Sequence, residues 1–128
     1  MNYPNGYKDV QQVHFIDAYN QAFTSENVSA NCTPLEQCDF SQKTLFLSSD
    51  GLSGFAISFD GELTNVFSLV KGRGKVLMGY AIGYGANNLD CFDGYLVPFY
   101  AQAGFIEVRR EANWTVGQPD VVYMVLAN

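Results

Sequence analysis

Three strand-like runs in the first half of the chain, separated by two Asp-Gly pairs, constrain the fold most strongly. The runs cover residues 44–49, 54–59 and 62–69, and Asp50-Gly51 and Asp60-Gly61 lie between them. Asp-Gly between such runs is a strong hairpin signal, because both residues tolerate the positive φ that a tight turn requires. The sequence therefore predicts an antiparallel meander over residues 44–69.

The spacing of apolar residues becomes helical after the meander. It predicts a helix over residues 74–85, with Gly85 as the left-handed stop. A second helix is predicted to begin at residue 96 or 97, because Pro98 fits only in the first turn, and to end at Gly104. Further strands are predicted over residues 88–92, 105–110 and 121–126.

The first third of the chain is less regular. Apolar residues between positions 8 and 23 are loosely spaced as on one helical face and predict an N-terminal helix. Residues 24–42 are polar and predict a loop, with or without a short helix over 34–37. The order α, β-meander, α, β, α, β, β is that of an α+β domain, and we expect residues 1–128 to form a single domain.

Composition excludes several classes of protein. The 128 residues are 48% hydrophobic and carry a net charge of −6, which is typical of a globular protein and unfavourable for binding nucleic acid or an anionic membrane. No apolar run approaches the roughly 20 residues that span a bilayer, and no signal peptide is visible. Three cysteines without a CxxC pair, and one histidine, predict reduced thiols, no metal site and a cytoplasmic location.

A basic, glycine-rich segment over residues 71–75 holds three of the seven Lys and Arg residues. Its two glycines let backbone N–H groups approach an anion, and the helix that follows adds its positive dipole end. Val76 and Leu69 break the P-loop pattern, and Leu77 breaks the dinucleotide fingerprint. The segment therefore predicts a phosphate cradle of another kind, and the alternative is a solvated basic turn that caps the helix.

Two motifs together resemble the GNAT acetyltransferase superfamily. They are Lys71-Gly72-Arg73-Gly74-Lys75 and Phe99-Tyr100-Ala101-Gln102-Ala103-Gly104-Phe105. The similar region runs from residue 62 to residue 109, and residues 89–105 also resemble small GNAT-like proteins of phages and bacteria. The resemblance implies a mixed, mostly antiparallel central sheet flanked by helices, with a splayed parallel pair of strands in its middle.

The resemblance also implies a site for acetyl-CoA as co-substrate, between the two central strands. The residues that would contact the coenzyme are Leu69, Lys71, Gly72, Arg73, Gly74, Lys75 and Phe99. Tyr100 would serve the leaving thiolate, and Glu62 on the central strand would act as the base. The segment aligns with the family pattern in two ways. If Lys71 is the basic position, Val76 stands where Gly or Ala is usual. If Gly72 and Gly74 are the glycine pair, Leu69 stands where the basic residue is usual.

Each of these residues also has an ordinary structural interpretation. Tyr100 is equally a core aromatic of its helix, and Glu62 a solvated residue after a turn. Asp90 and Asp93 are alternative bases, although Asp93 is equally explained as a helix cap. Cys91 is interpreted as a buried free thiol rather than a nucleophile, because no histidine is near it in sequence.

Two functions follow from these patterns. The first is acyl-CoA-dependent N-acyl transfer to an amine, which is either a small molecule or a protein. The alternative is a catalytically inactive GNAT-fold module, a phage-type accessory or inhibitor that binds a protein partner. The patterns leave the acceptor open, and both a monomer and a homodimer are compatible with them.

Overall fold

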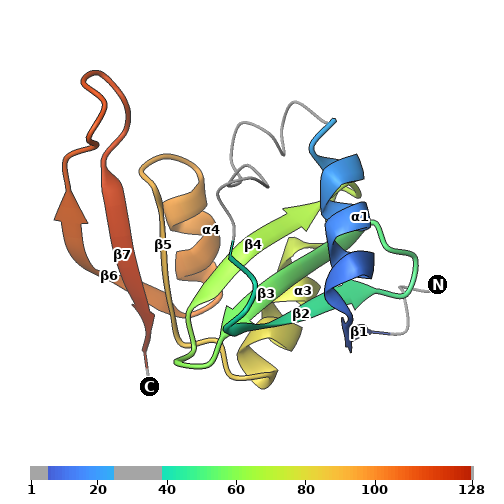
Figure 1. Cartoon of the computed structure of the whole chain (residues 1–128). Coiled ribbons are helices and arrows are strands. Elements are labelled where there is room, and N and C mark those ends of the chain that lie inside the picture. The colour runs from blue at the N-terminus through green and yellow to red at the C-terminus, as the bar shows by residue number, and fades with distance from the viewer. Residues whose placement is uncertain (1–5, 25–38, 128) are drawn as a thin grey trace.

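The computed structural model describes residues 6–24 and 39–127, which form two antiparallel sheets and three helices in these ranges (Figure 1). The first sheet has the strand order β1-β2-β3-β4 and the second the order β5-β7-β6. The strands are β1 (Tyr7–Val10), β2 (Lys43–Ser48), β3 (Ser53–Ser58), β4 (Leu63–Ser68), β5 (Asn88–Phe92), β6 (Phe105–Glu111) and β7 (Val121–Leu126). The helices are α1 (Gln12–Ala22), α3 (Gly74–Gly83) and α4 (Leu96–Gln102).

The meander predicted from the two Asp-Gly pairs is confirmed. β2 pairs with β3 and β3 with β4, all antiparallel. Gly51 and Gly61 have φ values of 72° and 93°, so each glycine supplies the left-handed position of its turn. The predicted helices over 74–85 and from residue 96, and the strands over 88–92, 105–110 and 121–126, are also present with shifts of one or two residues.

The N-terminal prediction is partly wrong. Tyr7–Val10 is an edge strand, and the helix begins only at Gln12. The chain turns from strand to helix at Gln11, whose ψ of 154° is extended. The buried face of α1 consists of Phe15, Tyr19 and Ala22, while Val13, which supported the helical spacing, is exposed. The short helix considered over 34–37 lies outside the described residues.

An isolated parallel bridge joins the strands of the two sheets in the described part of the chain. Glu62, just before β4, forms an isolated parallel bridge with Asn88 at the start of β5. Beyond it β4 pairs with β3 and β5 pairs with β7, so the two strands diverge (Figure 1). The expected splayed parallel pair, and with it the α+β fold class, is confirmed.

Buried side chains form a core on each face of the first sheet. The α1 side holds one cluster that includes Phe15, Tyr19 and Phe67. The other side holds a larger cluster that continues into the second sheet and includes residues of α3 and α4. The two faces of β4 are therefore both covered near its middle, which fixes the strand that leads to the glycine-rich segment.

β4 contains a bulge. Gly54 faces Phe67 and Ala56 faces Thr64, so two residues of β4, Asn65 and Val66, oppose one residue of β3. Asn65 has a φ of 55°, which asparagine tolerates better than most residues. Its buried Oδ1 accepts hydrogen bonds from Thr64 Oγ1 at 2.9 Å and Lys43 Nζ at 3.4 Å. The bulge thus bends the central strand just where it separates from β5.

Candidate functional site

The segment between β4 and α3 presents backbone donors at its surface. Gly72 has a φ of 87°, and a Cβ built on it would meet nothing within 4 Å. The Leu77 N–H donates to Arg73 O at 2.9 Å and is the first to bond back within α3. The N–H groups of Gly74, Lys75 and Val76 precede it and therefore lie at the open N-terminal end of the helix. This end suits an anion, because the helix dipole adds to the N–H groups.

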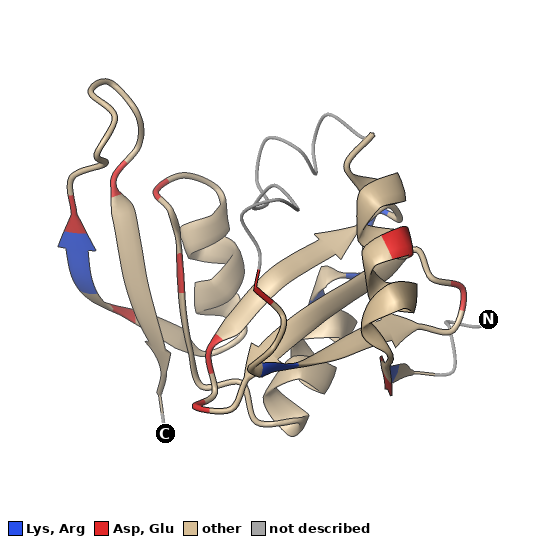
Figure 2. Cartoon of the chain, in the orientation of Figure 1, with Lys and Arg blue, Asp and Glu red and all other residues tan. Residues whose placement is uncertain are grey.

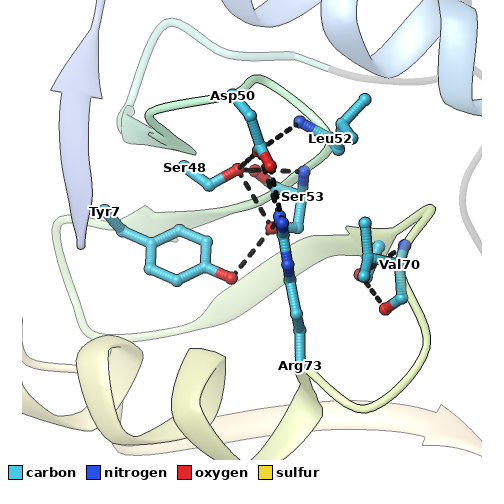
Figure 3. A network of polar contacts seen from close by, with 8 residues as sticks. Tyr7, Ser48, Asp50, Leu52, Ser53, Val70 and Arg73 are labelled. Atoms are coloured by element: carbon cyan, nitrogen blue, oxygen red, sulfur yellow. Dashed lines mark hydrogen bonds and ion pairs between the residues drawn. The ribbon is translucent and has the colours of Figure 1, made fainter. Parts of the chain in front are cut away.

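The three cations of the segment do not point the same way. Lys71 and Lys75 are exposed, whereas the Arg73 side chain is only 13% exposed and turns toward the β2–β3 turn (Figure 3). Its guanidinium donates to both carboxylate oxygens of Asp50, at 3.0 and 2.5 Å, and to Ser53 Oγ at 3.2 Å. The predicted phosphate cradle therefore keeps two exposed lysine side chains rather than three cations.

The Asp50–Arg73 pair belongs to a network that reaches the first strand (Figure 3). Asp50 also accepts hydrogen bonds from Ser48 Oγ at 2.7 Å and Leu52 N–H at 3.1 Å. Ser53 Oγ shares a hydrogen bond of 2.8 Å with the Tyr7 hydroxyl. The Arg73 guanidinium, above all, holds the pKa of Asp50 well below its usual range. The network ties the loop before α3 to three strands of the first sheet.

Gly74 and Phe99 bring the glycine-rich segment against α4. A Cβ on Gly74 would lie 2.5 Å from Phe99 Cε1, so any larger residue would force the ring or the backbone to move. The half-buried Phe99 ring packs edge-on against Tyr100, with ring centroids 5.0 Å apart. Tyr100 itself is 7% exposed and belongs to the core cluster shared by the two sheets. The predicted contacts at Gly74, Phe99 and Tyr100 thus lie side by side, and the catalytic role of Tyr100 stays a prediction.

Leu69 directly follows β4, on the N-terminal side of the glycine-rich segment. Its N–H donates to Leu52 O at 2.8 Å, which extends the pairing with β3 by one residue. The Ser68 hydroxyl then donates to Val70 O and accepts from Val70 N–H, at 2.7 and 3.1 Å, and so shapes the turn. The Leu69 side chain is exposed at the end of the strand. The contact between Leu69 and the coenzyme, which the family resemblance implies, stays a prediction.

Glu62 lies where the two sheets meet. Burial is the largest cause that raises the pKa of its carboxyl, and the negative charge of Asp90 adds to it, while Lys43 opposes the shift. A carboxylate with a raised pKa is a better proton acceptor near neutral pH than an ordinary surface glutamate. The fold therefore places a carboxylate with a raised pKa at the parallel bridge just before β4, and its role as the base stays a prediction.

The two alternative bases differ in their surroundings. Asp90 is exposed on β5, two pairing positions from Asn88, and is close enough to Glu62 to raise its pKa. Asp93 instead pairs with Arg110, its Oδ2 lying 2.7 Å from Arg110 Nη1. The first residue before α4 is Tyr95, which makes no side-chain cap, so Asp93 does not cap this helix.

Cys91 is a half-buried free thiol, and Cys32 and Cys38 lie outside the described residues. Burial and the nearby carboxylates of Asp90 and Asp93 raise the pKa of Cys91 to about 11. The thiol therefore stays protonated at neutral pH, which argues against a nucleophilic role.

Across residues 6–24 and 39–127, no three His, Cys, Asp or Glu side chains gather closely enough to hold a metal ion. Among the helices that the structure describes, none is both long and apolar enough to cross a membrane.

Sequence reasoning missed the partners of the charged groups. Nothing in the sequence pairs Arg73 with Asp50, which lies 23 residues earlier, or places Tyr7 beside Ser53. The Asp-Gly signal located the turn that carries Asp50, and the isolated basic cluster located Arg73. The signal that could have linked them is that a guanidinium in an acidic chain needs a carboxylate when it is buried.

Comparison with known proteins identifies the fold. No protein-family model matches the sequence, and no curated protein is similar to it in sequence. Spermidine N-acetyltransferase from Vibrio cholerae, solved with CoA and spermine, superposes with a TM-score of 0.63 at 11% identity, over 92% of each chain. A Bacillus subtilis acetyltransferase in complex with CoA gives a TM-score of 0.60 at 13% identity, over 96% of this chain and 98% of that one.

A third similar structure is the NatC complex bound to Gag peptide and CoA. It gives a TM-score of 0.59 at 16% identity, over 95% of this chain and 97% of that chain. The chain described above therefore has the GNAT fold, and the resemblance seen in its sequence is confirmed at the level of the fold.

Proposed function

We propose that this protein is an acyl-CoA-dependent N-acyltransferase that transfers an acyl group to an amine. The observation that carries the proposal is the open N-terminal end of α3, with Gly72 and two exposed lysines, beside strands that diverge from the Glu62–Asn88 bridge. The three similar structures support it, because each is described with CoA, and two with spermine or a peptide.

The residues of the glycine-rich segment would hold the pyrophosphate of acetyl-CoA. The N–H groups of Gly74 and Lys75 point out of the helix end, and Lys71 and Lys75 would supply the positive charge. Gly72 has no side chain and the space around it is open, so its backbone would be accessible to the phosphates. The exposed Leu69 and half-buried Phe99 flank the segment on either side and would contact the coenzyme.

Glu62 and Tyr100 would carry the proton transfers. The amine nitrogen attacks the thioester carbonyl, the C–S bond breaks, and an amide and a thiol form. Glu62, directly or through a water molecule, would take the proton that the amine loses. Tyr100 would donate a proton to the departing sulfur, in a core position that excludes most water.

Coenzyme binding is the first test. Coenzyme A at about 100 times its dissociation constant should raise the free energy of unfolding by about 2.7 kcal/mol, measured by thermal denaturation. Pantetheine, which lacks the phosphates, should give a much smaller shift. The absence of a shift at millimolar coenzyme A would contradict the proposal and favour a non-catalytic GNAT-fold protein.

A lysine variant tests the location of the site. Replacing Lys71 and Lys75 together by Ala should weaken coenzyme A roughly tenfold, because two charge-assisted contacts to phosphate are lost. Lys8→Ala is the matched control, since Lys8 is an exposed lysine on β1. Equal effects of the two changes would place the phosphates elsewhere. Acyl transfer itself can be measured by mass spectrometry of the acylated amine.

A further inference from the structure

A hollow lined by aromatic side chains lies at one end of the second sheet. It has a volume of about 450 Å³ and separates the β5–α4 loop from the tip of the β6–β7 hairpin, which lie at the same end of the molecule (Figure 1). Phe92, Tyr95 and Leu96 line it from one side, and Trp114 and Pro119 from the other. We call this space the aromatic hollow. It is distinct from the glycine-rich segment, none of whose residues lines it.

The rings of the aromatic hollow are exposed to an unusual extent. Trp114 is 82% exposed, Tyr95 60% and Phe92 40%. Single exposed apolar residues are common, but three large rings around one concavity keep a substantial apolar area in water. Such an arrangement is typical of a surface that is covered when a ligand binds.

Both walls of the aromatic hollow are held in place without a ligand. The Asp93 N–H donates to Asp120 O at 2.8 Å and so joins the two loops. The Arg110 guanidinium lies 2.7 Å from Asp93 and 3.6 Å from Asp120, and clamps the same point. Within the hairpin tip, the Asn113 side chain donates to Pro119 O at 2.9 Å and accepts from Thr115 N–H at 2.8 Å. A ligand would therefore meet a largely formed site.

Charge decides which ligand fits. Asp93 is the charged residue among those that line the aromatic hollow, and it shares Arg110 with Asp120 and Glu107, so the cluster beside the hollow carries a net negative charge. The neighbouring Arg109 is paired with Glu111 and lies over the Tyr123 ring, and Figure 2 shows these basic positions on β6 next to acidic ones. Ring faces beside excess negative charge attract organic cations and repel anions.

The aromatic hollow lies along the same strand face as Glu62. Asn88, Asp90 and Phe92 alternate on one face of β5, and Asn88 bridges to Glu62. Four residues of β-strand place Phe92 about 13 Å from that bridge. A compound seated in the aromatic hollow can therefore extend along β5 toward the carboxylate.

We propose that the aromatic hollow binds the apolar body of an organic ammonium compound, and that this compound is the amine acceptor. The second half of the statement rests on the proposed N-acyltransferase function, and the first does not. The rings supply the apolar and cation–π contacts, and the net negative charge of the cluster to which Asp93 belongs favours a positive ligand.

Trp114 reports on this proposal directly, because it is the only tryptophan of the chain. Its emission in the free protein should be that of a solvated indole. Phenethylamine, which is protonated at neutral pH, should shift that emission to shorter wavelength with saturation, at a dissociation constant of about 1 mM for so small a ligand. The neutral 2-phenylethanol should bind several-fold more weakly, and the anionic 3-phenylpropionate should give no saturable change. Equal responses to the three probes, or no saturable response to the amine, would overturn the proposal.

Two variants locate the binding. Tyr95→Leu keeps an apolar side chain but removes a ring face, and should weaken phenethylamine about fivefold in the same titration. Val116→Ala alters an exposed residue of the same hairpin tip that does not line the aromatic hollow, and should leave the affinity unchanged. Similar losses in both variants would mean that the probe binds elsewhere on the tip.

Catalytic measurements separate this proposal from the proposed function. With acetyl-CoA present, Tyr95→Leu should raise the KM about fivefold for 1,10-diaminodecane, whose two nitrogens can span the roughly 13 Å from the aromatic hollow to Glu62, and should leave kcat and coenzyme affinity unchanged. If the Trp114 titration saturates but coenzyme A does not bind, the proposed function fails and the cation site stands. If acyl transfer occurs but the titration is flat, the aromatic hollow is not the acceptor site.

Discussion

The Asp50–Arg73 pair can be tested against an internal control, because the chain contains the same turn twice. In both turns an aspartate Oδ1 accepts from a serine hydroxyl two residues earlier and from the N–H two residues later. The serines are Ser48 and Ser58, and the aspartates Asp50 and Asp60. The turns differ in that Asp50 also binds Arg73. Comparing Asp50→Asn with Asp60→Asn therefore isolates the ion pair.

The magnitude follows from the burial of the two partners. Exposed ion pairs contribute about 0–1 kcal/mol, and removing one partner of a buried pair costs about 3–5 kcal/mol. The Arg73 side chain is nearly buried and the Asp50 side chain 36% exposed, which places Asp50→Asn between these limits, at about 2 kcal/mol. The unfolding entropy of a chain this long is about 0.27 kcal/mol/K, so Tm should fall by about 7 °C.

The dependence on pH gives a second signature in the same thermal or urea denaturation assay. The pKa of Asp50 is lowered in the folded protein, so its contribution to stability is complete above the unfolded value of about 4. It is lost as the pH falls toward the folded pKa. The difference in stability between the natural protein and Asp50→Asn should therefore be constant from pH 7 to about pH 5 and smaller at about pH 3.

Asp60→Asn should change Tm little at either pH, because an asparagine oxygen can accept the same two hydrogen bonds and no cation is lost. Equal shifts in the two variants would refute the argument, since they would show that the turn and not the ion pair stabilises the protein. A difference that does not diminish at low pH would also refute it, because a neutral Asp50 cannot form the pair.

Three further changes address the site. Gly74→Ala should lower the free energy of unfolding by about 1–3 kcal/mol in urea denaturation and weaken coenzyme A binding, because its Cβ meets the Phe99 ring. Gly79→Ala, which lies in open space on α3, should instead raise the free energy of unfolding by about 0.5–1 kcal/mol. Glu62→Gln should abolish the acidic limb of the pH–rate profile, because the base acts only when ionised, above its raised pKa. It should leave stability at pH 7 unchanged or higher, since a raised pKa means that ionisation opposes folding. Tyr100→Phe should lower kcat while coenzyme A affinity stays constant, and equal loss of both in kinetics and calorimetry would indicate a structural role.

Local signals account for most of the fold that could be predicted. Asp-Gly turns, helical spacing and Pro98 each act within a few residues, and the elements that they predict are present. The N-terminal strand was not predicted, because its four residues show no sustained alternation of apolar and polar side chains. Tyr7 is buried because β2 and α3, which lie elsewhere in the chain, pack against it. A short edge strand depends on such tertiary contacts more than on its own sequence.

In the candidate site, too, local sequence could name residues but could not predict their tertiary surroundings. Gly72, Gly74, Lys71 and Lys75 could be named as candidates because they are neighbours in sequence and lead into a helix. The surroundings that change a residue's chemistry are not local: the carboxylate of Asp90, which raises the pKa of Glu62, lies 28 positions later and on the other sheet. The resemblance to the GNAT superfamily could name Glu62 as a candidate base at the start of the central strand, but could not predict the direction of its pKa shift.

The structure also changes what the basic segment can do. Three cations in five residues indicate one cluster around one anion, but burial assigns Arg73 to Asp50 and leaves Lys71 and Lys75 in solvent. An arginine in the cradle would bind phosphate through a fixed bidentate fork, whereas two lysines act as flexible point charges. If the coenzyme binds there, its affinity depends chiefly on the N–H groups at the start of α3 and on a salt-sensitive pair of lysines, while the arginine fixes the loop that presents them.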